Sequence, residues 1–140
     1  MVWTGLQAII GSVVAALAVR AAAQAALDIP SDFPPLMSPA PTIFLTVVGV
    51  ILAVAVFAEL RRSASHPIRS FRIAAAVALV LSFIPDIWLL TEAGGSSFPG
   101  ATIAGVGTLI VQHIVVAAVV VWLLTMRGDA PVSEKKSSGD

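Results

Sequence analysis

Four long apolar runs constrain this fold more than any other feature of the sequence. A helix that crosses a bilayer needs about 20 consecutive apolar residues, and four stretches reach that length, at about residues 2–27, 42–60, 71–90 and 101–126. None of them shows the polar and apolar alternation of a membrane barrel strand. In lipid each backbone group must be bonded within its own segment, which favours helices. We therefore predict an all-α membrane protein, a four-transmembrane-helix antiparallel bundle forming one domain over residues 1–127.

Composition supports lipid as the main solvent and excludes several kinds of chemistry. The chain is 58% hydrophobic and only 11% charged, whereas a soluble domain carries about a quarter charged residues. The sequence has no Cys and no Tyr, which excludes disulfides, thiolate metal sites and phenolic catalysis. No basic patch resembles a nucleic-acid footprint, so we expect membrane lipid as a partner and no nucleic acid.

The distribution of basic residues predicts the orientation in the membrane. In a four-span arrangement only Arg20 falls outside the basic side, which cytoplasmic loops normally form. The residues of that side are Arg61, Arg62, Arg69, Arg72, Arg127, Lys135 and Lys136. The opposite side carries Asp28, Asp32 and Glu92. We expect a multi-pass protein of the cell membrane, with both termini cytoplasmic and the connections 28–41 and 91–100 outside.

The connections differ in composition. Residues 28–41 contain five prolines and are expected to be extended and irregular, similar to polyproline II. Residues 91–100 are rich in Gly and Ser and predict a tight turn. The polar residues 128–140 predict a disordered cytoplasmic tail. A signal peptide cleaved near residues 21–23 is an alternative for the first run, although this run lacks a basic start and is long.

Pro85 and Asp86 stand side by side inside the third run. Proline removes a backbone donor, and a carboxylate in hydrocarbon is costly unless it finds a partner. At about 1.5 Å per residue, Asp86 lies roughly 6 Å and Arg20 roughly 10 Å inside the same membrane face. The two residues could pair across helices, or Arg20 could extend to the headgroups. Asp86 is then either a structural pin or a proton- or cation-binding group.

His113 is expected near the middle of the fourth run, roughly 18 Å deep. At that depth it lies too far from Asp86 for direct contact. A His in this position can relay protons, or it can be neutral and bonded to Gln7, Ser12 or a backbone carbonyl. The intramembrane polar candidates are Arg20, Gln24, Ser82, Pro85, Asp86, Gln112 and His113.

Four arginines flank the connection between the second and third runs, and they suit contact with anionic lipid. They are Arg61, Arg62, Arg69 and Arg72. The simpler interpretation is that they only set the orientation. No Ser/His/Asp spacing, phosphate loop or set of metal ligands stands out, so we expect no catalytic residue, no metal and no cofactor.

Three segments carry a resemblance to a known family. They are His66-Pro67-Ile68-Arg69-Ser70-Phe71-Arg72, Leu79-Val80-Leu81-Ser82-Phe83-Ile84-Pro85-Asp86 and Gln112-His113-Ile114-Val115-Val116-Ala117. With four spans around them, the chain resembles a family of small uncharacterised actinobacterial integral membrane proteins, a domain of unknown function. The resemblance implies a four-helix protein of a bacterial inner membrane and implies no activity.

Three classes of function follow from these features. Because polar groups in the spans are few, we favour a non-enzymatic scaffold, a regulatory subunit or a partner-binding membrane subunit. One alternative is a small proton- or cation-coupled transporter that uses Asp86, Arg20 and His113. It would work as a homo-oligomer or with a membrane protein partner, because four spans rarely enclose a pathway alone. A lipid- or quinone-modifying membrane enzyme is the second alternative.

Overall fold

The computed structural model describes residues 2–126, and all regular secondary structure in this range is helical. The helices are α1 (Val2–Ala26), α2 (Pro34–Met37), α3 (Pro39–Ser63), α4 (Pro67–Trp88), α5 (Glu92–Ser97) and α6 (Ile103–Met126). The four long helices are α1, α3, α4 and α6, and each is long and apolar enough to cross a membrane. They overlap the four predicted runs. The expected tail, residues 128–140, lies outside the described residues.

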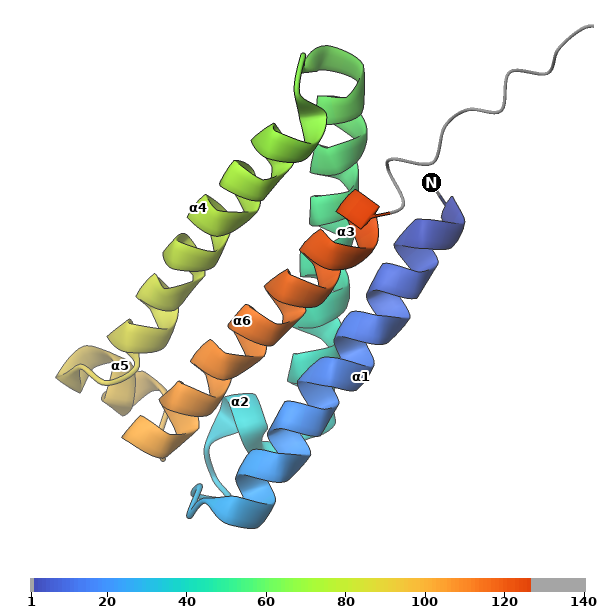
Figure 1. Ribbon diagram of the computed structural model, residues 1–140. Coiled ribbons are helices and arrows are strands. Elements are labelled where there is room, and N and C mark those ends of the chain that lie inside the picture. Colours follow the sequence, from blue (N-terminus) through green and yellow to red (C-terminus); the bar gives the residue numbers. More distant parts are fainter. Residues whose placement is uncertain (1, 127–140) are drawn as a thin grey trace, which may run out of the picture.

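The helix ends lie toward the two ends of the bundle, as Figure 1 shows. The α3–α4 connection, the first turn of α1 and the last turn of α6 lie at one end, which we call the loop end. The short helices α2 and α5 lie at the other, which we call the short-helix end. Helix α6 lies between α1 and α4 and also contacts α3. This central position brings α6 side chains to three neighbouring helices.

The proline-rich connection is more helical than its composition predicts. Residues 34–37 form α2, and α3 begins at Pro39 rather than near residue 42. Proline is tolerated in the first turn of a helix, where its missing N–H has no intrahelical partner in any case. The same preference starts α4 at Pro67. The expectation of an extended segment across residues 28–41 is therefore wrong for its second half.

The second connection contains a short helix where a tight turn is expected. Helix α5 begins after Thr91, whose hydroxyl accepts a hydrogen bond from the Gly94 N–H at 3.2 Å. Threonine is a favoured N-cap, and Glu92 in the first turn complements the helix dipole. The chain then turns at Gly100, whose φ of +78° is a conformation that favours glycine.

The core of the bundle is divided into two apolar clusters. The cluster in the half toward the loop end consists of Ala8, Val50, Phe57, Phe71, Val120 and Leu124. The cluster at the short-helix end consists of Phe33, Leu36, Leu89 and Val106. Most buried polar residues lie between the two along the long helices: Ser12, Thr42, Asp86, Thr108 and Gln112. A further one, Thr125, follows Leu124 of the loop-end cluster. The centre of the bundle is therefore a polar belt between two apolar clusters.

The outer surface of the four long helices is apolar and mostly uncovered. Phe44 and Leu45 on α3 and Val80 on α4 are each about two-thirds exposed. A soluble monomer rarely exposes large contiguous apolar surface. Lipid is the solvent that such a surface requires, so the structure supports a multi-pass membrane protein.

Candidate functional site

His113 and Asp86 meet in the polar belt. The Nδ1 atom of His113 lies 3.0 Å from the Oδ2 atom of Asp86 and 2.9 Å from the Leu109 carbonyl oxygen. Both neighbours accept hydrogen bonds when the carboxyl is ionised, so this arrangement places a proton on Nδ1. The Leu109 carbonyl oxygen meets the hydrogen-bond geometry, whereas the Asp86 Oδ2 atom is in contact but has no aligned hydrogen bond among the described residues. The imidazole of His113 is therefore the nearest polar side-chain group to the buried carboxylate.

This contact corrects the expected separation of the two residues. The predicted depths assume that the ends of the helices lie at one level. Asp86 is two residues from the end of α4, whereas His113 is ten residues from the start of α6. At about 1.5 Å per residue, their contact requires α6 to begin roughly 12 Å beyond the end of α4. The residues between them, including α5, occupy that space.

Arg20 and Gln24 lie elsewhere, and of the two alternatives for Arg20 the pair with Asp86 is not formed. The Nη2 atom of Arg20 and the Nε2 atom of Gln24 both donate to the Leu36 carbonyl oxygen, at 2.9 and 3.0 Å. That carbonyl is in the last turn of α2, where carbonyls lack intrahelical partners. Arg20 and Gln24 therefore join the end of α1 to α2, away from the carboxylate.

Gln112 connects the belt to α1. Its Nε2 atom donates to the Ala16 carbonyl oxygen at 3.0 Å, and the residue is buried. Ser82 donates instead to the Leu79 carbonyl of its own helix at 2.7 Å. Pro85 lies inside α4 and is exposed. Of the seven intramembrane candidates, Asp86 and His113 are in contact, and Ser82, Gln112 and His113 line one groove. Arg20 and Gln24 share the Leu36 carbonyl instead.

A groove of about 510 Å³ opens beside these residues. Residues of α3, α4, α6 and both short-helix connections line it: Pro34, Pro35, Pro41, Thr42, Leu45, Thr46, Gly49, Ser82, Phe98, Leu109, Gln112, His113 and Val116. None of these residues is Asp, Glu, Lys or Arg. The volume lies in the usual range of small-molecule sites, which are mostly apolar with a few polar groups. A side chain at Gly49 would meet open space.

One polar atom in the wall of the groove is left without a partner. Thr42 is 8% exposed, and its Oγ1 atom has no hydrogen-bond partner among the described residues. A buried hydroxyl normally has a partner, because an unsatisfied one costs about 1–3 kcal/mol. His113, whose side chain is 42% exposed, lines the same groove. The wall therefore offers a hydroxyl and an imidazole to a bound molecule.

The α3 side of this groove was not predicted from the sequence. Thr42, Thr46 and Gly49 follow one another at four and three residues, which places them on one helix face. Two hydroxyl residues and a glycine at this spacing in an apolar run were the signal that could have indicated it. Phe98 was not detectable in this way, because it reaches the groove through the connection after α5.

The four arginines of the loop end do not all line the same cavity. Arg61, Arg69 and Arg72 line a second cavity, whereas Arg62 is not among its lining residues. Among residues 2–126, no three His, Cys, Asp or Glu residues are grouped so that they could hold a metal ion.

The comparisons with known proteins identify a family without assigning an activity. A family of unknown function, DUF6069, matches residues 1–130. No curated protein and no solved structure matches the chain. The expected membership in a family of unknown function is confirmed, and the actinobacterial origin stays a prediction.

Proposed function

The chain belongs to the DUF6069 family of unknown function, and we propose that it is a non-enzymatic, ligand-binding subunit of a bacterial cell membrane. In this proposal the groove beside His113 takes up an uncharged amphipathic molecule from the lipid phase. The molecule has an apolar tail and a small hydrogen-bonding group, and it binds without being changed.

The observation that carries the proposal is the chemistry of the groove wall. Its surface is mainly apolar, and the described residues that line it carry no carboxylate, ammonium or guanidinium. A ligand with a full charge would therefore lose its hydration without gaining an opposite charge. A neutral group that hydrogen-bonds to Thr42 and His113 would satisfy the free hydroxyl. Leu45, which also lines the groove, is 66% exposed, so an apolar tail can enter from the lipid.

The proposed orientation rests on charge. The loop end carries Arg61, Arg62, Arg69 and Arg72, and the described residues near the short-helix end include Asp28, Asp32 and Glu92. Because Lys and Arg prefer cytoplasmic loops, we propose that the loop end and both termini are cytoplasmic. The four spans then run antiparallel. The groove then lies in the outer half of the bilayer.

The test fills the groove without touching its polar groups. Gly49→Leu places a side chain in open space on the groove wall. Gly107→Leu is the matched control, because Gly107 is also in a long helix, also has open space around it and does not line the groove. Each full-length variant is purified in mild detergent, and the co-purified lipids are quantified by mass spectrometry.

We expect one class of neutral lipid to be enriched with the wild-type protein and with Gly107→Leu. The same class should fall at least about tenfold with Gly49→Leu. Equal recovery from all three proteins would refute the groove as the binding site, and recovery of only bulk lipid would refute binding itself.

A second candidate function is proton- or cation-coupled transport, which the direct His113–Asp86 contact favours. The buried carboxylate lies behind a His that lines the groove, so a proton could pass between them. This function needs a homo-oligomer or a membrane protein partner to complete a pathway. Reconstituted wild type and Asp86→Asn are compared for proton flux, and equal flux would exclude this role for Asp86.

A further inference from the structure

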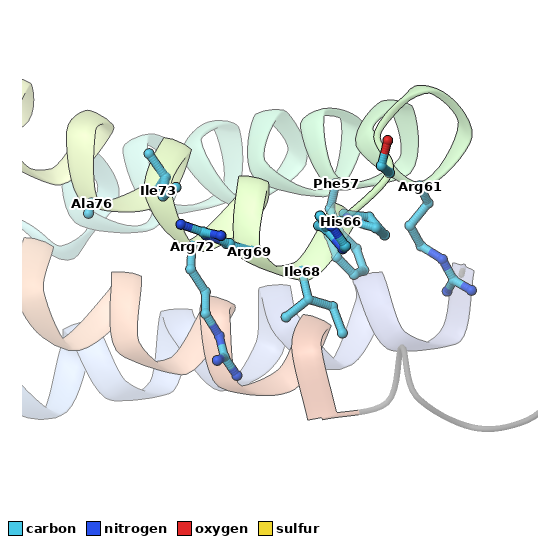
Figure 2. A pocket seen from close by; sticks show the side chains of 10 residues that line it. Phe57, Arg61, His66, Ile68, Arg69, Arg72, Ile73 and Ala76 are labelled. Carbon is cyan, nitrogen blue, oxygen red and sulfur yellow. The ribbon is translucent and has the colours of Figure 1, made fainter.

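The loop end holds a second, larger cavity whose chemistry is opposite to that of the groove. It has a volume of about 1030 Å³ between the end of α3 and the start of α4. Its lining includes Arg61, His66, Arg69 and Arg72 and, among residues 2–126, contains no Asp or Glu. In Figure 2, Arg61 and Arg72 extend on either side of Phe57 and Ile68. The cavity therefore combines cationic groups at its edge with an apolar wall.

The cationic and apolar groups are arranged along the axis of α4. Arg69, Arg72, Ile73 and Ala76 line the cavity and recur at the spacing of one helix face. The arginines come in the first turns, and the apolar residues follow further into the span. A molecule bound along this face meets positive charge at the helix end and hydrocarbon deeper in the membrane.

The start of α4 adds to the positive potential. Pro67 has no N–H, but the N–H groups that follow it in the first turn lack intrahelical acceptors and favour anions. His66, at the N-cap, makes no side-chain capping bond, and the first turn of α4 contains no acidic residue. On the α3 side, the Arg61 guanidinium carbon lies 6.0 Å from the centre of the Phe57 ring. This distance suits a cation–π contact, which holds that arginine beside the cavity.

We propose that this cavity is a specific binding site for one anionic phospholipid. Its phosphate lies among Arg61, Arg69, Arg72 and the start of α4, and an acyl chain runs along Ile73 and Ala76. A diffuse attraction of anionic lipid to basic residues would use all four arginines equally. The cavity instead separates three lining arginines from Arg62. The site is independent of the groove, and its occupancy should not change with Gly49→Leu.

The test measures lipid binding to the full-length protein by native mass spectrometry in detergent. The probes are phosphatidylglycerol and phosphatidylcholine, with soluble glycerol phosphate as competitor. We expect one tightly bound phosphatidylglycerol per chain. Arg61→Gln, Arg69→Gln and Arg72→Gln should each weaken it at least about fivefold, while Arg62→Gln should weaken it less than twofold.

A further variant tests the apolar half of the site. Ala76→Phe fills the deeper part of the cavity without changing any charge, and it should reduce phosphatidylglycerol binding at least about fivefold. Equal effects of all four arginine substitutions would overturn the site in favour of diffuse attraction. Equal binding of phosphatidylcholine, displacement by millimolar glycerol phosphate, or full binding to Ala76→Phe would each overturn it as well.

Discussion

The coupling between His113 and Asp86 can be measured with a double-mutant cycle. The cycle consists of His113→Ala, Asp86→Ala and the double substitution. His113→Ala leaves a carboxylate that is 6% exposed without its contacting side chain, which should cost more than the about 1–3 kcal/mol of an unsatisfied neutral group. Asp86→Ala should cost less, because the His113 side chain is 42% exposed and can be hydrated.

The expected coupling follows from the 3.0 Å separation. A carboxylate and a ring N–H in contact attract each other, and a polar contact with one charged partner contributes about 1.5–3 kcal/mol. Partial exposure of His113 screens this attraction, and desolvation of Asp86 offsets part of it. The net coupling should then be about 1–3 kcal/mol, the usual range for residues in direct contact.

The assay is unfolding of the full-length protein in mixed micelles with increasing denaturing detergent. The matched control is the cycle of Arg20→Ala with Asp86→Ala, because the structure separates these two residues. The control should be additive within about 0.5 kcal/mol. If the His113–Asp86 cycle were equally additive, or if the Arg20–Asp86 cycle were the coupled one, His113 would not be the partner of Asp86.

Three further substitutions test the fold by the same unfolding assay. Phe57→Ala should cost about 3–5 kcal/mol, because Phe57 is 1% exposed and packs against the tilted ring of Phe71 with ring centres 4.9 Å apart. A cost under about 1 kcal/mol would contradict this packing. Gly94→Ala should cost about 1–3 kcal/mol, because its Cβ would overlap the Trp88 carbonyl oxygen. In the control Gly95→Ala, the added Cβ meets nothing closer than 3.9 Å. Equal stability of the two variants would contradict the position of α5. Gln112→Leu should cost about 0.6–1.7 kcal/mol, the range for hydrogen bonds between membrane helices, and no loss would show that its bond to the Ala16 carbonyl does not stabilise the bundle.

The existence of four spanning helices could be predicted because length and hydropathy decide it. A run of about 20 apolar residues has few other ways to satisfy its backbone in lipid. The helix starts could not be predicted as well. Pro34, Pro39 and Pro67 are all in the first turn of a helix, but proline is equally common in extended segments. Whether a proline-rich segment becomes helical depends on what it packs against.

The polar partners were harder to predict than the spans. Counting residues from the end of each helix gives its depth only if all helices end at one membrane plane. Helices α4 and α6 are offset along their axes, so the counted depths of Asp86 and His113 are wrong. Arg20 and Asp86 have opposite charges and similar counted depths, yet Arg20 binds the Leu36 carbonyl. That carbonyl lies in α2, where no following helical N–H bonds to it, whereas the proline content predicts an extended segment.

The two core clusters should open at different rates, because they differ in the number of buried residues. Sub-global opening of a protein follows cooperative units with different stabilities. The cluster at the short-helix end has fewer buried members than the cluster toward the loop end, and it borders the groove through Pro34 and Pro35. In hydrogen exchange, the amides of α2 and α5 should therefore exchange much earlier than those around Phe57. Such intermittent opening would set the rate at which a molecule enters or leaves the groove, while the helices of the loop end stay folded.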